Sequence, residues 1–115
     1  FIPHHATPFR NFPAGSAEQT LYLLSLIRLI RPNILLPATT ALGSVSPDGR
    51  ERALRAGANV IMPNLSPCAE RSKYSLYDNK LATGMESAQN LALLREAVAA
   101  VGYRVVTARG DVKNP

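Results

Sequence analysis

The sequence has one cysteine, no tryptophan, few charged residues and no long apolar run. Its single cysteine, Cys68, excludes an internal disulfide and favours a reducing, cytoplasmic environment. No segment approaches the roughly 20 apolar residues that span a membrane. The N-terminus also lacks the basic start and apolar core of a signal peptide. We therefore expect neither a membrane partner nor a secreted protein.

The formal net charge of +5 does not indicate nucleic-acid binding. The basic residues are scattered, and no aromatic residues alternate with them to form a stacking surface for bases. Apolar residues make up 46% of the chain and charged residues 18%, without a low-complexity run, so the composition is that of a globular domain or part of one. Solvated helix faces account for the charges, and no nucleic-acid partner is expected.

Start and stop signals predict three helices. Ser16 and Gln19 form a capping box at the first start, and Pro32 ends this helix because the residue before a proline is pushed out of the helical region. Gly57 is suited to a left-handed end of the second helix, and Gly102 closes the third. The expected starts are Ser16, Ser46 (with Pro47 and Asp48) and Thr83 (with Glu86). The expected core stripes are Leu21, Leu24, Ile27 and Leu29 in the first helix, and Leu91, Leu94, Val98 and Val101 in the third.

Apolar and β-branched runs predict strands at Ile34–Leu36 and Asn59–Met62, and a final strand at Tyr103–Thr107. Strand, turn, helix and strand form one step of a TIM-type (βα) barrel. We expect an α/β fold: the C-terminal portion of such a barrel, with two to three parallel strands, three helices and an N-terminal loop over residues 1–15. A closed barrel needs about 250 residues. The isolated chain should therefore lack an N-terminal barrel portion and self-associate through exposed edges.

Several motifs resemble the biotin-synthase-like radical S-adenosylmethionine (SAM) enzymes. They are FIPH at 1–4, TP at 7–8, PATTALG at 37–43, GRE at 49–51, AGANVIMPNL at 56–65 and YSLY at 74–77. Together they are most similar to the FeFe-hydrogenase maturases of the HydE type, and the region corresponds to the biotin and thiamin synthesis associated domain. The resemblance implies a part in assembling the hydrogenase diiron centre, on a small-molecule or iron-complex substrate.

The same resemblance implies two cofactors in the full-length parent: S-adenosylmethionine and a 4Fe–4S cluster held by a C-x3-C-x2-C loop. One cysteine cannot supply three thiolate ligands. We therefore expect this chain alone to bind neither cofactor and to be inactive. Its expected contribution is to line the substrate pocket and complete the fold, without catalytic residues or metal ligands of its own.

Thr39, Thr40, Ala41 and Leu42 are the candidate substrate-binding or anion-binding residues. Two adjacent hydroxyls at the carboxyl end of a barrel strand, with outward backbone N–H groups, suit a carboxylate or another anion. The resemblance implies the same role. The alternative is that β-branched threonines are simply favoured in strands and cap turns.

Further along the chain, the resemblance implies that Met62 lines the cavity near SAM, although a methionine is more often core filler. Asn64 orients a polar ligand or merely ends the strand. Tyr74 and Tyr77 are three positions apart, so on a helical turn their rings share a face and could close over the barrel mouth. The alternative is that the two rings pack on a loop surface.

Two other features receive simpler interpretations. His4 and His5 on an extended segment should point to opposite sides, and no acidic or cysteine residue with ligand spacing accompanies them. A loop histidine that makes a hydrogen bond is the favoured interpretation. Cys68 follows a proline in a loop and has no partner cysteine, so we regard it as incidental.

Two alternative functions stay open. The chain could belong to another biotin-synthase-like enzyme, one that inserts sulfur or rearranges a carbon skeleton. It could also be a stand-alone, non-catalytic half-barrel that oligomerises or binds anions.

Overall fold

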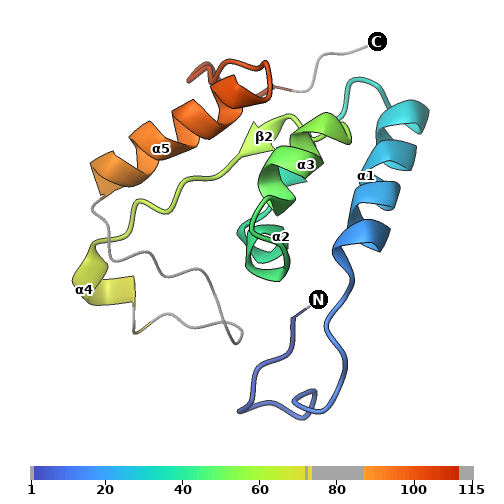
Figure 1. Cartoon of the computed structure of the whole chain (residues 1–115), viewed down its shortest axis with the longest axis vertical. Coiled ribbons are helices and arrows are strands. Elements are labelled where there is room, and N and C mark those ends of the chain that lie inside the picture. Colours follow the sequence, from blue (N-terminus) through green and yellow to red (C-terminus); the bar gives the residue numbers. More distant parts are fainter. Residues whose placement is uncertain (1, 72, 74–86, 112–115) are drawn as a thin grey trace.

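The computed structural model describes residues 2–71, 73 and 87–111 (Figure 1). Within these residues the elements run α1 (Ala17–Ile30), β1 (Pro37–Ala38), α2 (Thr40–Val45), α3 (Gly49–Arg55), β2 (Val60–Ile61), α4 (Cys68–Arg71) and α5 (Ser87–Ala100). The two strands are parallel, with Pro37 opposite Val60 and Ala38 opposite Ile61. The expected α/β class with parallel strands is thus confirmed, but there are more helices and fewer strand residues than predicted.

Helix α1 follows its sequence signals closely. Ser16 is the N-cap, and its Oγ accepts a hydrogen bond from the N–H of Gln19 at 3.1 Å. The helix ends at Ile30, just before the Arg31-Pro32 pair, as predicted. Its core stripe is shorter than expected: Leu21 and Leu24 pack against the core, whereas Leu29 is 77% exposed. The predictions for Leu29 and for Ile27, which is 38% exposed, are wrong because Arg28 takes the inward position in the last turn, where its Nε donates to the carbonyl of Gly57. The two neighbours of Arg28 are each turned about 100° away around the helix axis.

The predicted second helix is α3, and an additional helix, α2, precedes it in the segment before Ser46. Thr39 caps the additional helix, α2, through a hydrogen bond from the N–H of Leu42 to its Oγ1 at 3.2 Å. Ser46 is the C-cap of α2 instead of the N-cap of the next helix, because its own N–H donates to the carbonyl of Leu42 at 3.0 Å. Helix α3 therefore begins only at Gly49, after the N-cap Asp48. It ends as predicted, near a left-handed Gly57 with φ of 110°.

The first strand lies later in the chain than predicted, and Asn59 explains why. Its Oδ1 accepts a hydrogen bond from the N–H of Leu36 at 2.8 Å, and its Nδ2 donates to the carbonyl of Ile34 at 3.3 Å. The side chain of Asn59 thus takes the place of a strand neighbour along the predicted strand Ile34–Leu36. Ladder pairing begins one residue later, at Pro37 opposite Val60.

The predicted third strand, Tyr103–Thr107, is absent from the described residues 103–107, which form no regular element. Gly102 ends α5 as predicted, and its φ of 86° lies in the left-handed region. The N–H of Tyr103 then donates back to the carbonyl of Val98 at 3.1 Å, so this backbone group closes the helix instead of joining a sheet. Val105 alone keeps a core contact.

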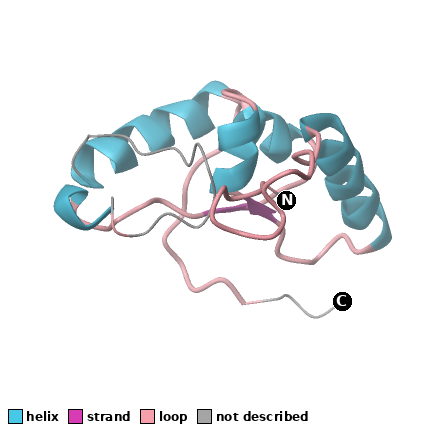
Figure 2. Ribbon diagram, turned by 90° about the horizontal axis from the view of Figure 1, so that it is seen from below, coloured by secondary structure: helices cyan, strands magenta, loops and turns pink. Residues whose placement is uncertain are grey.

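The core is small and forms between the helices and the strands. Its buried members are Ala17, Ala38, Leu42, Ala53, Leu54, Ala58 and Val98. In α5, Leu94 and Val98 are buried and Val101 packs beside them, which confirms most of the predicted stripe, and Leu91 is half-buried. The predicted start of this helix, at Thr83 and Glu86, lies outside the described residues. Figure 2 shows the helices gathered on one side of the strand pair, with the C-terminal segment passing on the other.

Candidate functional site

Thr39 stands where β1 becomes α2. Its backbone is extended, with φ of −76° and ψ of 153°, and its Oγ1 accepts the capping bond from Leu42. Thr39 therefore caps a helix, which is the alternative to a binding role given for it above. A hydroxyl that accepts one bond still carries a hydrogen that it can donate. Thr40 is the first residue of α2 and is half-buried.

A small pocket opens beside Thr39. Its volume is about 80 Å³, and it is lined by Ile2, Gly15, Ser16, Thr20, Thr39, Ala41, Leu42 and Val45. Three of the predicted binding residues, Thr39, Ala41 and Leu42, line it. Ligand sites for whole small molecules are several times larger, about 300–1,000 Å³. This pocket therefore suits one small polar group, such as a carboxylate.

Two other hydroxyls lie in the pocket and were not predicted as site residues. Ser16 is the N-cap of α1, and the Oγ1 of Thr20 donates to the carbonyl of Ser16 at 3.0 Å. The packing of α1 beside α2 places them next to Thr39. The sequence marked Ser16 only as a helix cap, and nothing in its pattern linked α1 to the PATTALG motif.

Met62 lies beside Thr39 across the sheet. Each residue directly follows its strand, and the last ladder pair is Ala38 with Ile61. Because side chains alternate along a strand and paired residues share a face, Thr39 and Met62 leave the sheet on the face opposite to Ala38. Ala38 is 1% exposed beneath the helices, whereas Met62 is 52% exposed. Met62 is therefore not core filler in this structure.

The other predicted pocket residues contribute less to the described site. The Oδ1 of Asn64 accepts a hydrogen bond from the N–H of Ser66 at 3.1 Å, which is the local turn expected of a residue that ends a strand. Tyr74 and Tyr77 lie outside the described residues.

The histidines correct one expectation and bear out another. The rings of His4 and His5 are stacked, with centroids 4.3 Å apart, so they do not point to opposite sides. The N–H of Thr7 donates to the carbonyl of His4 at 3.0 Å. This hydrogen bond closes a turn, which bends the segment and brings the two rings together. The Nδ1 of His4 accepts a hydrogen bond from the N–H of Ala6, as favoured for a loop histidine. Cys68 is the first residue of α4 and does not lie in the loop that was expected. The N–H of Glu70 donates to the carbonyl of Pro67 and so closes the first turn of this helix.

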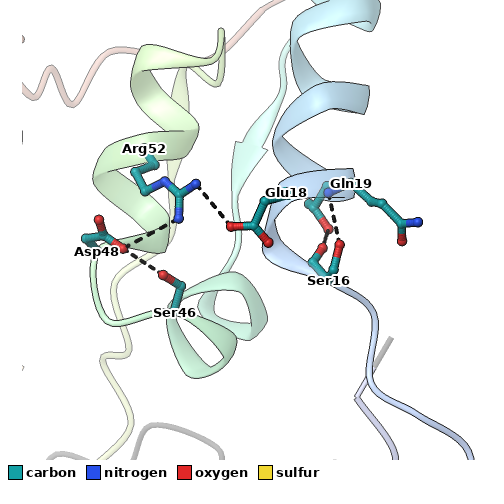
Figure 3. Close-up of polar contacts among 7 residues, drawn as sticks. Ser16, Glu18, Gln19, Ser46, Asp48 and Arg52 are labelled. Atoms are coloured by element: carbon teal, nitrogen blue, oxygen red, sulfur yellow. Dashed lines mark hydrogen bonds and ion pairs between the residues drawn. The ribbon is translucent and has the colours of Figure 1, made fainter.

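A polar network joins α3 to the start of α1 beside the pocket (Figure 3). Arg52 contacts Glu18 at 3.3 Å and Asp48 at 4.0 Å, and the hydroxyl of Ser46 donates to Asp48 at 2.6 Å. A backbone hydrogen bond in the first turn of α1, and then Arg52, lower the pKa of Glu18. The hydroxyl of Ser46 lowers the pKa of Asp48. The network holds the helix that carries Ser16 and Thr20 against α3.

The described residues contain neither a group of metal-ligating side chains nor a helix that could cross a membrane. Among residues 2–71, 73 and 87–111, no three His, Cys, Asp or Glu side chains are grouped so that they could hold a metal ion. In the same part of the chain, no helix combines the length and the apolarity needed to cross a membrane.

Comparison with known proteins gives close relatives. No protein-family model matches the chain. The chain is 48% identical over 81 residues to the FeFe-hydrogenase maturase subunit HydE of Thermotoga maritima, a match that covers 70% of this chain and 23% of the relative. Over matches of the same extent, it is 33% and 32% identical to the 3-methylornithine synthases of Methanosarcina barkeri and Methanosarcina acetivorans.

The chain thus spans less than a quarter of the length of these relatives. The two kinds of relative match it over the same share of its length, and the resemblance of the PATTALG and AGANVIMPNL motifs pointed to the same group. This chain is similar to a segment of HydE and therefore belongs to the biotin-synthase-like radical SAM enzymes.

Proposed function

We propose that this chain is the C-terminal substrate-pocket segment of a radical SAM enzyme that resembles HydE and takes part in hydrogenase cofactor assembly. The observation that carries the proposal is the difference in similarity: 48% identity to HydE against 33% to a 3-methylornithine synthase, each over 81 residues. The full-length protein would act in the cytoplasm on a small-molecule or iron-complex substrate.

The described fold supports a place in a TIM-type barrel. Strands β1 and β2 are parallel and are connected through α2 and α3. Parallel strands joined by a helix are the repeating unit of such a barrel. The whole chain would form one segment of it, residues 1–15 serving as an N-terminal loop. The face that carries Thr39 and Met62 would then point toward the barrel interior.

Within this proposal, Thr39, Thr40, Ala41 and Leu42 hold a carboxylate or another anionic group of the substrate. The small volume of the pocket beside Thr39 and its hydroxyl lining support that role for Thr39, Ala41 and Leu42, which line it, whereas Thr40 is included because it directly follows Thr39. Both threonine hydroxyls can donate to an anion, and charge-assisted hydrogen bonds of this kind are short and strong.

Met62 and Asn64 would line the cavity near SAM, with Tyr74 and Tyr77 closing over it. The exposure of Met62 on the open face of the sheet supports its part in this arrangement.

The iron–sulfur cluster of the group does not fit this chain. Such a cluster is held by several cysteine thiolates, and the chain has only Cys68. The cluster and most SAM contacts would belong to the missing barrel portion, and the isolated chain would be inactive. We also propose that the isolated chain self-associates; a monodisperse monomer in light scattering would contradict this.

The second candidate is another biotin-synthase-like radical SAM enzyme, for which the similarity to 3-methylornithine synthase is the supporting observation. A stand-alone half-barrel module is the third. Assays of the full-length protein for hydrogenase activation and for methylornithine formation separate the first two candidates. The third predicts that the natural protein contains no iron.

The role of the threonines is tested in the full-length protein by Thr40→Val, and by Thr39→Ser against Thr39→Val. Thr39→Ser keeps both the cap on Leu42 and a hydroxyl donor, so it should bind substrate normally. Thr40→Val removes a donor without removing that cap, and should weaken substrate binding about tenfold, or ~1.4 kcal/mol. Thr107→Val, on an exposed residue outside the pocket, is the control. Unchanged affinity in both valine variants would refute the assignment.

A further inference from the structure

The segment that follows α5, residues 103–111, passes on the face of the strand pair opposite to the helices, as Figure 2 shows. Two contacts hold it there. Val105 packs against the core, and a Cβ built at Gly110 would lie 3.7 Å from the Cδ1 of Leu35. The segment therefore runs from the end of α5 to the residues that precede β1.

The contact of Gly110 lies at the amino ends of the strands. Leu35 comes two residues before β1 begins at Pro37. Thr39 and Met62, in contrast, directly follow β1 and β2 at their carboxyl ends. Because the two strands are parallel, their amino ends share one edge of the sheet and their carboxyl ends the other. Gly110 and the candidate substrate site are thus at opposite ends of the strand pair.

Leu35 faces the side of the sheet that would become the barrel interior. Leu36 and Ala38 are 7% and 1% exposed on the side of the helices. Side chains alternate along an extended chain, so Leu35 takes the opposite face, the same face as Thr39. In a closed barrel the side chains of this face fill the interior in layers. Gly110 therefore lies against the interior layer that is farthest from the substrate site.

Side chains, and not a β-ladder, attach the segment. Residues 103–111 form no strand, and the N–H of Tyr103 donates to the carbonyl of Val98 at the end of α5. Val106, directly after the packed Val105, is 67% exposed. A segment with few buried apolar contacts and no ladder opens locally at a low free energy. Such a segment is suited to cover an opening, and contributes little to holding the sheet together.

We infer that residues 103–111 are a strap that closes the amino end of the barrel in the full-length protein, opposite to the substrate site. The strap covers Leu35 and keeps water from the interior layer at that end. Thr39 stays accessible from the carboxyl ends of the strands. The inference rests on the proposed barrel, but not on the identity of the substrate.

The experiment compares Val105→Ser and Val106→Ser with the unsubstituted full-length protein. The two neighbouring valines form a matched pair, because one packs against the core and the other is 67% exposed. The readout is amide hydrogen exchange, followed by mass spectrometry in two peptides. One peptide covers residues 33–38, at the amino end of β1, and the other covers residues 40–45, beyond its carboxyl end. Far-UV circular dichroism shows which variants are folded.

Val105→Ser should raise the exchange rate of residues 33–38 at least about tenfold, because a released strap no longer covers this edge. Val106→Ser should leave that rate unchanged, and residues 40–45 should exchange equally fast in all three proteins. Equal rates at residues 33–38 in the two variants would overturn the inference. An increase that extends equally to residues 40–45 would also overturn it, since Val105 would then support the whole unit.

If Val105→Ser does not fold, a disulfide decides. Leu35→Cys combined with Gly110→Cys should form a disulfide within one chain on oxidation, identified by peptide mass spectrometry. Phe12→Cys combined with Gly110→Cys is the control, because the N-terminal loop and the C-terminal segment lie at opposite ends of the molecule (Figure 1). Absence of the first disulfide would overturn the inference. Neither readout uses substrate, so a failure of the proposed substrate role leaves this result interpretable.

Discussion

Gly57 is a position where a single added methyl group should be costly for two separate reasons, backbone strain and a close contact. Its φ of 110° is rare for residues with a side chain. A Cβ built there would lie 2.7 Å from the Cβ and 2.8 Å from the Cγ of Arg28. Arg28 cannot easily move away, because its Nε donates to the carbonyl of Gly57 at 2.8 Å and its Nη1 donates to the carbonyl of Pro32.

A comparison with Gly102 separates the free-energy cost of the contact with Arg28 from the cost of the left-handed backbone. It has a similarly positive φ of 86°, but an added Cβ would meet nothing within 4 Å. Gly102→Ala should therefore cost only the left-handed backbone term, about 1–2 kcal/mol. Gly57→Ala should cost the same term plus overpacking against Arg28, a further ~1–3 kcal/mol. The smaller entropy of the unfolded alanine chain affects both variants equally and cancels in the comparison.

The measurement is guanidinium unfolding of both variants and the unsubstituted chain, followed by far-UV circular dichroism at one protein concentration. Fixed concentration matters because any association would shift the apparent stability. Gly57→Ala should be less stable than Gly102→Ala by the overpacking term. If the two alanine variants differ by less than about 0.5 kcal/mol, the close contact between α1 and the end of α3 is not as described.

Three further predictions concern local hydrogen bonds. Asn59→Ala should destabilise the chain by about 1–3 kcal/mol, because it leaves the N–H of buried Leu36 without its partner; Asn59→Asp keeps that acceptor and should cost less in the same unfolding assay. Ser16→Ala should cost about 1 kcal/mol through loss of the α1 cap, and Ser16→Thr should restore most of it. Because the folded-state pKa values of Glu18 and Asp48 are lowered, their stabilisation is present above the ordinary carboxyl range and is lost as pH falls through the folded values. Urea midpoints should therefore decrease below about pH 4, and less so in the Arg52→Met variant.

Signals that lie within a few residues of each other were the reliable ones. The Ser16 cap, the stop before Pro32 and the helix ends at Gly57 and Gly102 are set by local backbone geometry, and all four were predicted correctly. Ser46 shows the limit of this approach. Serine followed by proline and aspartate is typical of a helix start, but the N–H of Ser46 already closes α2. The hydroxyl of Ser46 is instead hydrogen-bonded to Asp48, and Asp48 occupies the N-cap position of α3.

Strand positions depended on distant residues and were less well predicted. In the apolar run Ile34–Leu36, the side chain of Asn59, a residue from another part of the chain, satisfies the N–H of Leu36 and the carbonyl of Ile34. Tyr103–Thr107 has the composition of a strand, but a strand also needs a neighbouring edge, which composition does not report. At the site, the position of Thr39 at a strand's carboxyl end followed from the motif, whereas Ser16 and Thr20 reached it only through helix packing.

The strand pair of this unit points to a larger assembly. The strand pair has only two residues per strand and packs helices against one face, so the sheet itself contributes little independent stability. Ala38 and Ala53, at 1% and 0% exposed, anchor that face to the helices. Thr39 and Met62 leave the sheet on its other face. In a closed barrel, strands of the adjoining units would pair beside β1 and β2 and enclose that face. Substrate binding at Thr39 and completion of the fold would then depend on the same missing elements.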